Sequence, residues 1–197
     1  VRSRRQRQMC IRDSNCSSVV INDQKAAFNA VEHLIKQGKK NIAHLRGPLL
    51  PQNSIDRFLG YRKALEQYGL EYRKEWVFTC DQISNEEGYA YTQEIIEKHP
   101  EIDAIFAVAD MPAVGAIKCL NEQKIVIPDQ IAVMGFSNWR ISNLVTPTLS
   151  TVNQPGIEMG EKAFELFHKE QQLIKKGESV VYEKIELDTK LIIRQSS

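Results

Sequence analysis

The sequence predicts an α/β fold: a mostly parallel, doubly wound sheet with helices on both faces. From residue 19 onward, short apolar runs typical of strands alternate with segments of 3.6-residue periodicity typical of helices. The run Ala104–Val108 is continuously apolar, as in strands that are buried on both faces. Strands that alternate with helices of this length imply right-handed crossovers, and therefore parallel pairing.

The first elements are indicated by periodicity and by glycines that end helices. Apolar side chains repeat at helical spacing before Gly38 and again before Gly69. Ser54 is a candidate N-cap for the second of these helices. The expected order is strand, helix, strand, helix, strand, at Val19–Ile21, Ala26–Gln37, Lys40–Arg46, 54–68 and Trp76–Thr79.

The later elements are bounded by prolines. Pro100 should end one helix, and Pro112 suits the first turn of the next. The stretch from Pro147 to Pro155 predicts an extended connection, and Asp188-Thr189 suggests a hairpin. The expected order is helix, strand, helix, strand, helix and two strands, at Asn85–Lys98, Ala104–Val108, 112–122, Ile131–Met134, Gly156–Gln172, Val181–Leu187 and Leu191–Arg194.

The composition favours a globular protein whose partner is a small molecule or another protein. Apolar residues make up 42% of the chain, enough for a core, and no run of about 18 apolar residues predicts a membrane span. The four cysteines form no CxxC pair, so we expect no metal site, no cofactor and reduced thiols in a cytoplasmic protein. No secretory signal is visible.

Residues 1–18 differ from the rest of the chain. They hold five arginines and one aspartate, whereas the remainder has no basic excess to attract nucleic acid. Three interpretations are open: a disordered tail, a basic arm for nucleic acid, or a translated sequencing adapter joined to a truncated gene. We favour the adapter, in which case these residues carry no function.

Four stretches in order, and the end of the chain, resemble the effector-binding domain of the LacI/GalR family of transcription repressors. The resemblance covers nearly everything from Val19 onward. The stretches are AVEHLIKQGKKNIAHLRG, DRFLGYRKALEQYGL, DAIFAVADMPAVGAIKCL and IPDQIAVMGFSNWRISNLVTPTLSTVNQPGIEMGEKA, and the end is LIIRQSS.

The resemblance implies two Rossmann-like subdomains of the periplasmic-binding-protein-like type, with a ligand in the cleft between them. On that template residues 25–148 form the C-terminal subdomain. Residues 19–24 and 149–197 form the remaining part of the N-terminal subdomain, which is therefore expected to be incomplete.

The implied function is the sensing of a sugar or related metabolite by a DNA-binding regulator. Operator DNA would be bound only through an N-terminal headpiece that this chain lacks, and the regulator would be a homodimer. The alternative is a periplasmic sugar-binding protein of a transporter, which shares the fold. The upstream sequence would distinguish a helix-turn-helix from a secretory signal.

Arg57 and Asp110 are the first candidate ligand-binding residues. Arg57 matches the family's R-x-x-G-[YF] arginine, whose guanidinium can donate to hydroxyls or a carboxylate. Its alternative is a solvated helix arginine. Asp110 follows a buried strand, where polar groups line clefts of such sheets. Its alternative is an N-cap of the following helix.

Ser137 and Asn138 follow the apolar run Ile131–Met134 and Gly135. Ser137 stands where the family often has an aspartate that accepts from sugar hydroxyls. A neutral serine implies a ligand that is bound differently or is anionic. For both residues the alternative is turn formation through bonds to nearby backbone.

Asn53 and Ile83 complete the candidate site. Asn53 lies in the loop before the Arg57 helix, and its side chain can donate to a ligand hydroxyl. The alternative is a loop asparagine without a role in binding. Ile83 aligns with a position that packs an aromatic ring on the ligand in relatives. Isoleucine offers apolar contact only, and core packing is the alternative.

A dimer face is the second expected site. As in relatives, Val114, Ile117, Leu144 and Val145 are its candidates, with ordinary core membership as the alternative. Trp139 could serve either the dimer face or the rim of the cleft.

Catalysis is not expected. The sequence has no G-x-S-x-G elbow, no Walker loop and no H-E-x-x-H motif. Its four histidines lie on separate elements without an evident nucleophile.

Overall fold

The computed structural model describes residues 16–197, which fold as two compact units. Unit 1 contains 16–22 and Pro155–Thr189, and unit 2 contains Asp23–Gln154 and Lys190–Ser197. The predicted tail lies outside the described residues up to residue 15. Its last residue, Ser18, already belongs to a strand.

Unit 2 is built on a six-stranded sheet in the order β3-β2-β4-β5-β6-β8. The strands from β3 to β6 pair in parallel, and β8 runs antiparallel to β6. This mostly parallel sheet confirms the predicted fold class. The bounds are β2 (Ile42–Arg46), β3 (Val77–Thr79), β4 (Ala104–Ala107), β5 (Ala132–Ser137), β6 (Ser150–Asn153) and β8 (Lys190–Ile192).

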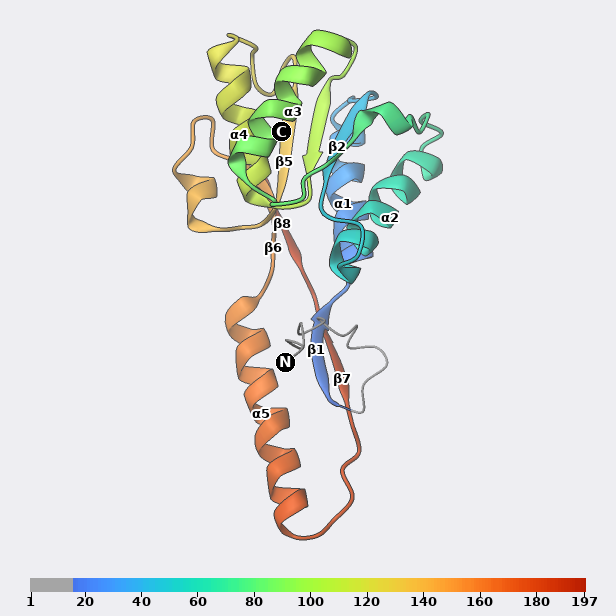
Figure 1. Cartoon of the computed structure of the whole chain (residues 1–197), viewed down its shortest axis with the longest axis vertical. Coiled ribbons are helices and arrows are strands. Elements are labelled where there is room, and N and C mark those ends of the chain that lie inside the picture. The colour runs from blue at the N-terminus through green and yellow to red at the C-terminus, as the bar shows by residue number, and fades with distance from the viewer. Residues whose placement is uncertain (1–15) are drawn as a thin grey trace, which may run out of the picture. The chain divides into compact units, whose positions relative to one another are not determined.

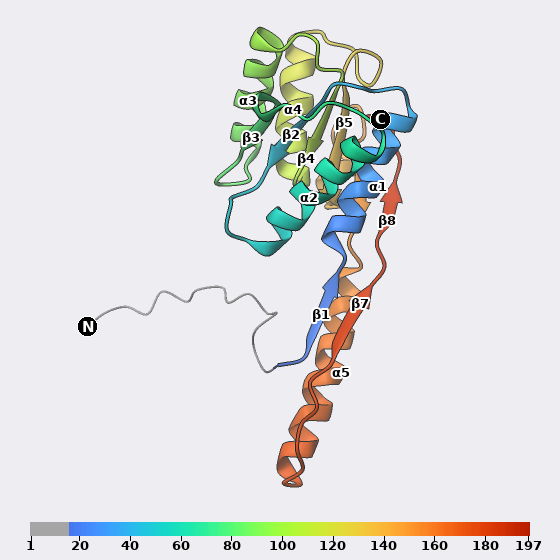
Figure 2. The ribbon, with the colours of Figure 1, turned by 90° about the vertical axis from the view of Figure 1, so that its right-hand side faces the viewer.

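Four α-helices cover the two faces of this sheet. Helices α1 and α2 pack together on one face, and α3 and α4 pack together on the other (Figures 1 and 2). Helix α3 begins with a capping box, in which Ser84 and Glu87 satisfy each other's backbone N–H groups. The helices are α1 (Asp23–Lys36), α2 (Gln52–Gln67), α3 (Asn85–Lys98) and α4 (Asp110–Glu122), with short 3-10 turns η2 (Lys74–Trp76) and η3 (Arg140–Asn143).

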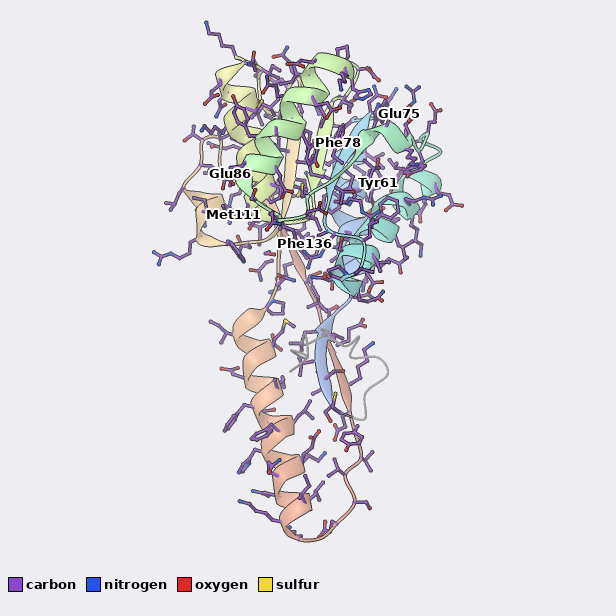
Figure 3. All side chains as sticks on the ribbon, in the orientation of Figure 1. Tyr61, Glu75, Phe78, Glu86, Met111 and Phe136 are labelled. Carbon is purple, nitrogen blue, oxygen red and sulfur yellow. The ribbon has the colours of Figure 1, made fainter. Side chains whose placement is uncertain are left out.

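The core of unit 2 has two layers because strand side chains alternate between the faces. Ile105 and Leu120 belong to the apolar layer beneath α3 and α4. In the other layer the His44 ring stacks between Tyr61 and Phe106, with ring centroids 5.0 and 4.9 Å away. The Tyr61 hydroxyl, labelled in Figure 3, donates to the Ile42 carbonyl at 2.8 Å.

Unit 1 contains two parallel strands and one long helix. Strand β1 (Ser18–Ile21) pairs with β7 (Lys184–Leu187), and helix α5 (Gly156–Lys175) contacts β1. The predicted hairpin at Asp188-Thr189 is wrong. Strand β7 pairs with β1, whereas the chain beyond it joins the other unit as β8.

The expected subdomain boundaries also need correction. Residues 149–197 were assigned with 19–24, but β6 hydrogen-bonds along β5 and β8 along β6. Residues 149–154 and Lys190–Ser197 therefore belong to unit 2. The predicted extended connection before Pro155 contains strand β6, because its residues complete the ladder of a sheet that would otherwise end at β5.

Candidate functional site

The sheet order of unit 2 has a switch point beside β2. The chain passes from β2 to β3 on one side and then returns to β4 on the other. Ligands of open α/β sheets bind outside the carboxyl ends of the strands at such a point. We call this end of unit 2 the carboxyl edge. It comprises the residues that follow β2, β4 and β5.

Arg57 lies buried at the carboxyl edge, with 5% of its surface exposed. Its Nε and Nη2 contact Asp23 Oδ1 at 2.7 Å each, and Nη1 donates to the Val108 carbonyl at 2.7 Å. Its guanidinium lies 3.7 Å from the centre of the Phe136 ring, labelled in Figure 3. The alternative of a solvated helix arginine is wrong, because the sheet, Asp23 and the ring enclose the charge.

Burial governs the ionisation of this pair. Loss of solvent raises the pKa of Asp23, which the Arg57 charge partly offsets. Loss of solvent likewise lowers the pKa of Arg57, which Asp23 partly offsets. Both groups therefore depend on each other to remain charged inside the protein.

Asp110 is buried at the start of α4 and is bonded on both oxygens. Oδ1 accepts from Thr151 Oγ1 and Oδ2 accepts from the Trp139 backbone N–H, each at 2.6 Å. Burial raises its pKa, against the effect of these bonds. The N-cap alternative is wrong, because Ala109 holds that position and no side-chain cap bond forms. A Cβ on Gly135 would lie 2.5 Å from Oδ1, so glycine makes room for the carboxylate.

Ser137 and Asn138 both have positive φ, 113° and 54°. The Asn138 side chain is half-buried and is hydrogen-bonded through both of its polar atoms. Its Nδ2 donates to Asn153 Oδ1 and its Oδ1 accepts from Arg194 Nη2, both at 2.8 Å. Ser137 is half-buried, and its hydroxyl makes no hydrogen bond within the described part of the chain. Ser137 is thus the candidate whose polar group remains available.

Asn53 lies in the first turn of α2 and not in the loop where it was expected, and Ile83 lies between β3 and α3. Asn53 is exposed, and its Oδ1 accepts from the Ser54 N–H at 2.9 Å. A Cβ on Gly47 would lie 2.9 Å from Ser54 Oγ and 3.5 Å from Ile83 Cδ1. The Ser54 cap prediction is wrong, because α2 begins at Gln52 after Pro51, with no side-chain cap.

The structure brings the six candidate residues to one end of unit 2. Most of their polar side chains are already engaged in hydrogen bonds within the protein. Arg57 and Asp110 share that end, since Arg57 Nη1 donates to the carbonyl of Val108, two residues before Asp110. Sequence reasoning missed Asp23, Thr151 and Arg194, which bind the candidates. Asp23 and Arg194 are polar residues that follow strands closely, whereas Thr151 lies within β6.

The expected dimer residues divide between surface and core. Leu144 is 76% exposed, Val114 and Val145 are half-buried, and Ile117 is 2% exposed within the α3–α4 core layer. Ile117 therefore offers no surface to a partner, and its assignment to the dimer face is corrected to core. The structure also has an open hollow of about 790 Å³, and one of its lining residues, Ile141, is close to Leu144 in sequence. The hollow is lined by Asn85, Met111, Val114, Asn138, Trp139, Arg140 and Ile141.

No group of three or more His, Cys, Asp or Glu side chains within residues 16–197 could hold a metal ion. No helix in the same range is long and apolar enough to cross a membrane.

Comparison with known proteins identifies the family to which this chain belongs. Residues 31–197 match the family described as a periplasmic binding protein-like domain, and the chain belongs to it. Within that family it belongs with the effector-binding domains of LacI-type transcription regulators.

Three relatives support this placement. The NTD biosynthesis operon regulator NtdR of Bacillus subtilis is 35% identical over 88% of this chain and 51% of its own length. The ribose operon repressor of Halalkalibacterium halodurans is 32% identical over 94% of this chain and 54% of its own length. A LacI family regulator from Enterococcus faecium, solved with bound ribose, has a TM-score of 0.81 and 25% identity over 92% of this chain and 65% of its own. The chain spans about half the length of the two curated relatives.

Proposed function

We propose that this chain is the effector-sensing domain of a LacI-type transcription regulator. Unit 2 would form one wall of the site for a sugar or related metabolite. Operator DNA would be bound through a separate headpiece. The observation that carries the proposal is the convergence of Arg57, Asp110 and Ser137 at the carboxyl edge of a domain from this family.

The geometry suits a ligand rich in hydroxyl groups. Asn53 is exposed at the start of α2, and the Ser137 hydroxyl is without a partner among the described residues. Both side chains can donate to and accept from a hydroxyl. The buried Arg57–Asp23 pair and Asp110 give these groups a rigid support. The regulators among the relatives favour this function over a periplasmic transport protein or an enzyme.

A saccharide panel tests the proposal. Mono- and disaccharides, including ribose, are added to the regulator that carries this chain, and its melting temperature is measured. A ligand at about 100 times its Kd adds ~2.7 kcal/mol of stability, a shift of several degrees. Asn53→Ala should reduce that shift, whereas Asn29→Ala, at an exposed asparagine of α1, should not. A panel without any shift would contradict a sugar effector.

We also propose that the regulator is a homodimer and that Leu144 and Val114 lie in its interface. Leu144 is 76% exposed, and Trp139, which lies nearby in sequence and lines the open hollow, is 59% exposed. Leu144→Glu should convert the dimer to a monomer in sedimentation velocity. Leu59→Glu, at a 41% exposed leucine of α2, is the control. A Leu144→Glu protein that remains dimeric would exclude this face.

A further inference from the structure

The turn after β5 holds two successive non-glycine residues at positive φ, Ser137 at 113° and Asn138 at 54°. Elsewhere in the described residues only Ile83 and Lys124 share this property, each alone. Residues with a Cβ rarely adopt this region, although asparagine tolerates it better than most. Such a conformation persists only where the surroundings fix it.

Asn138 is fixed through both ends of its side chain. The amide Nδ2 donates to Asn153 Oδ1 at 2.8 Å, and Oδ1 accepts from Arg194 Nη2 at 2.8 Å. Its backbone N–H donates to Thr151 Oγ1 at 3.3 Å. The bond from Arg194 is charge-assisted, the stronger kind of hydrogen bond.

Arg194 is itself anchored independently of Asn138. Its Nη1 donates to the Leu149 carbonyl at 2.6 Å and to Ser142 Oγ at 3.2 Å. Its backbone N–H donates to Ser150 Oγ at 2.8 Å. The guanidinium is thus a fixed fork that can hold Asn138 rather than follow it.

The turn is held on its other side by Asp110, whose Oδ2 accepts from the Trp139 N–H at 2.6 Å. Ser137 directly precedes these two attached residues at the end of β5, and its hydroxyl makes no hydrogen bond within residues 16–197. The protein therefore holds Ser137 in a strained conformation without using its polar group. That arrangement is expected where the group serves a bound molecule.

We propose that Arg194 is a positioning residue: by holding Asn138 at positive φ, it directs the Ser137 hydroxyl to the effector. The identity of the bound molecule rests on the proposed function. The hold of Arg194 on the turn is a property of the chain itself and can be measured without a ligand.

Hydrogen exchange of the Asn138 and Trp139 amides tests this hold in the regulator that carries the chain. In Arg194→Ala both amides should exchange roughly tenfold faster or more, because the turn loses a charge-assisted bond. The amide of Ile105 in β4 should keep its rate. Arg62→Ala, at an exposed arginine of α2, is the matched control and should change neither rate.

A second variant separates positioning from general support. Glycine adopts positive φ without strain, so Arg194→Ala/Asn138→Gly should regain slow exchange at Trp139. Arg194→Lys, which keeps the charge but not the fork, should fall between wild type and Arg194→Ala. Arg194→Lys decides the question if Arg194→Ala does not fold.

The outcomes separate the two proposals. Unchanged exchange at Asn138 and Trp139 in Arg194→Ala, or no recovery in the glycine double variant, overturns the role of Arg194. Where ribose or another saccharide of the panel binds, Arg194→Ala should weaken its binding about tenfold or more. The double variant should restore the affinity. Faster exchange in a protein that binds no saccharide supports the positioning role and contradicts the sugar effector.

Discussion

The two units of this chain differ in how much of their apolar surface they bury. Unit 2 encloses side chains such as Phe106 and Leu45 completely between a six-stranded sheet and four helices. In unit 1 the buried apolar side chains among the described residues are Ile21 and Leu166. Unit 2 thus contains its own core, and the candidate binding groups lie at the edge of that core.

Helix α5 shows the contrast most directly. Four of its apolar side chains are more than half exposed: Ile157, Phe164, Phe167 and Ile174. Strands in parallel sheets are normally covered on both faces, and β1 and β7 form a sheet of only two strands. Sequence pattern alone does not reveal this difference, because α5 and the helices of unit 2 are all amphipathic.

The largest expected effect distinguishes the cores of the two units. Phe106→Ala in β4 should lower the free energy of unfolding by about 4 kcal/mol, because it removes a fully buried ring and leaves a cavity. Phe164→Ala in α5, at a 68% exposed position, should cost no more than about 0.5 kcal/mol. Urea denaturation of the two variants measures both values. Equal losses would show that unit 1 buries α5 as firmly as unit 2 buries β4.

The buried ion pair at the carboxyl edge should give the next largest effect. Arg57→Ala leaves the Asp23 carboxylate and the Val108 carbonyl without their partner. Breaking such a pair costs about 3 kcal/mol, so this variant should lose stability as well as binding. Urea denaturation should show the loss, and Arg62→Ala should lie within about 0.5 kcal/mol of wild type. Equal free energies of unfolding for the two variants would show that the Arg57–Asp23 pair does not stabilise the fold.

His44 should make unit 2 sensitive to acid. Burial lowers its pKa from 6.5 to about 3, while the Phe106 carbonyl, which accepts from Nδ1, opposes this shift. The unfolded chain then binds the proton more readily, so stability falls as pH falls from about 6.5 toward 3. Between pH 7 and pH 5 the loss is about 2 kcal/mol for this group.

Denaturation at the two pH values checks this expectation. His44→Phe keeps an aromatic ring in the stack but has no proton to bind, so it should lose about 2 kcal/mol less than wild type on acidification. His168→Gln, at an exposed histidine of α5, is the control. Identical pH dependence of His44→Phe and wild type would show that His44 is not the acid-sensitive group.

The sequence predicted the elements well where periodicity was local and less well where pairing was distant. The helix at Asn85–Lys98 was predicted with the bounds that the structure shows. Strand β6 and the partner of β7 were not, because both depend on which unit a segment joins. No local pattern around Asp188 reveals that the chain leaves one unit there and enters the other.

The candidate site was predicted in outline. Arg57, Asp110 and Ser137 were expected near one another because strands of a parallel sheet end at the same edge. Asp23, Thr151 and Arg194, which bind Arg57, Asp110 and Asn138 respectively, were not expected, since each lies far away in sequence from the residue that it binds. Consequently the sequence suggested an Arg57 that is free to bind a ligand, whereas the structure shows one that is already engaged.

We propose that the carboxyl edge of unit 2 binds the effector through Ser137. Isothermal titration of the saccharide that shifts the melting temperature, compared between wild type and Ser137→Ala, tests it most directly. We expect an affinity at least tenfold weaker in the variant, with an unchanged melting temperature in the absence of ligand. Equal affinities would place the binding site elsewhere on the protein.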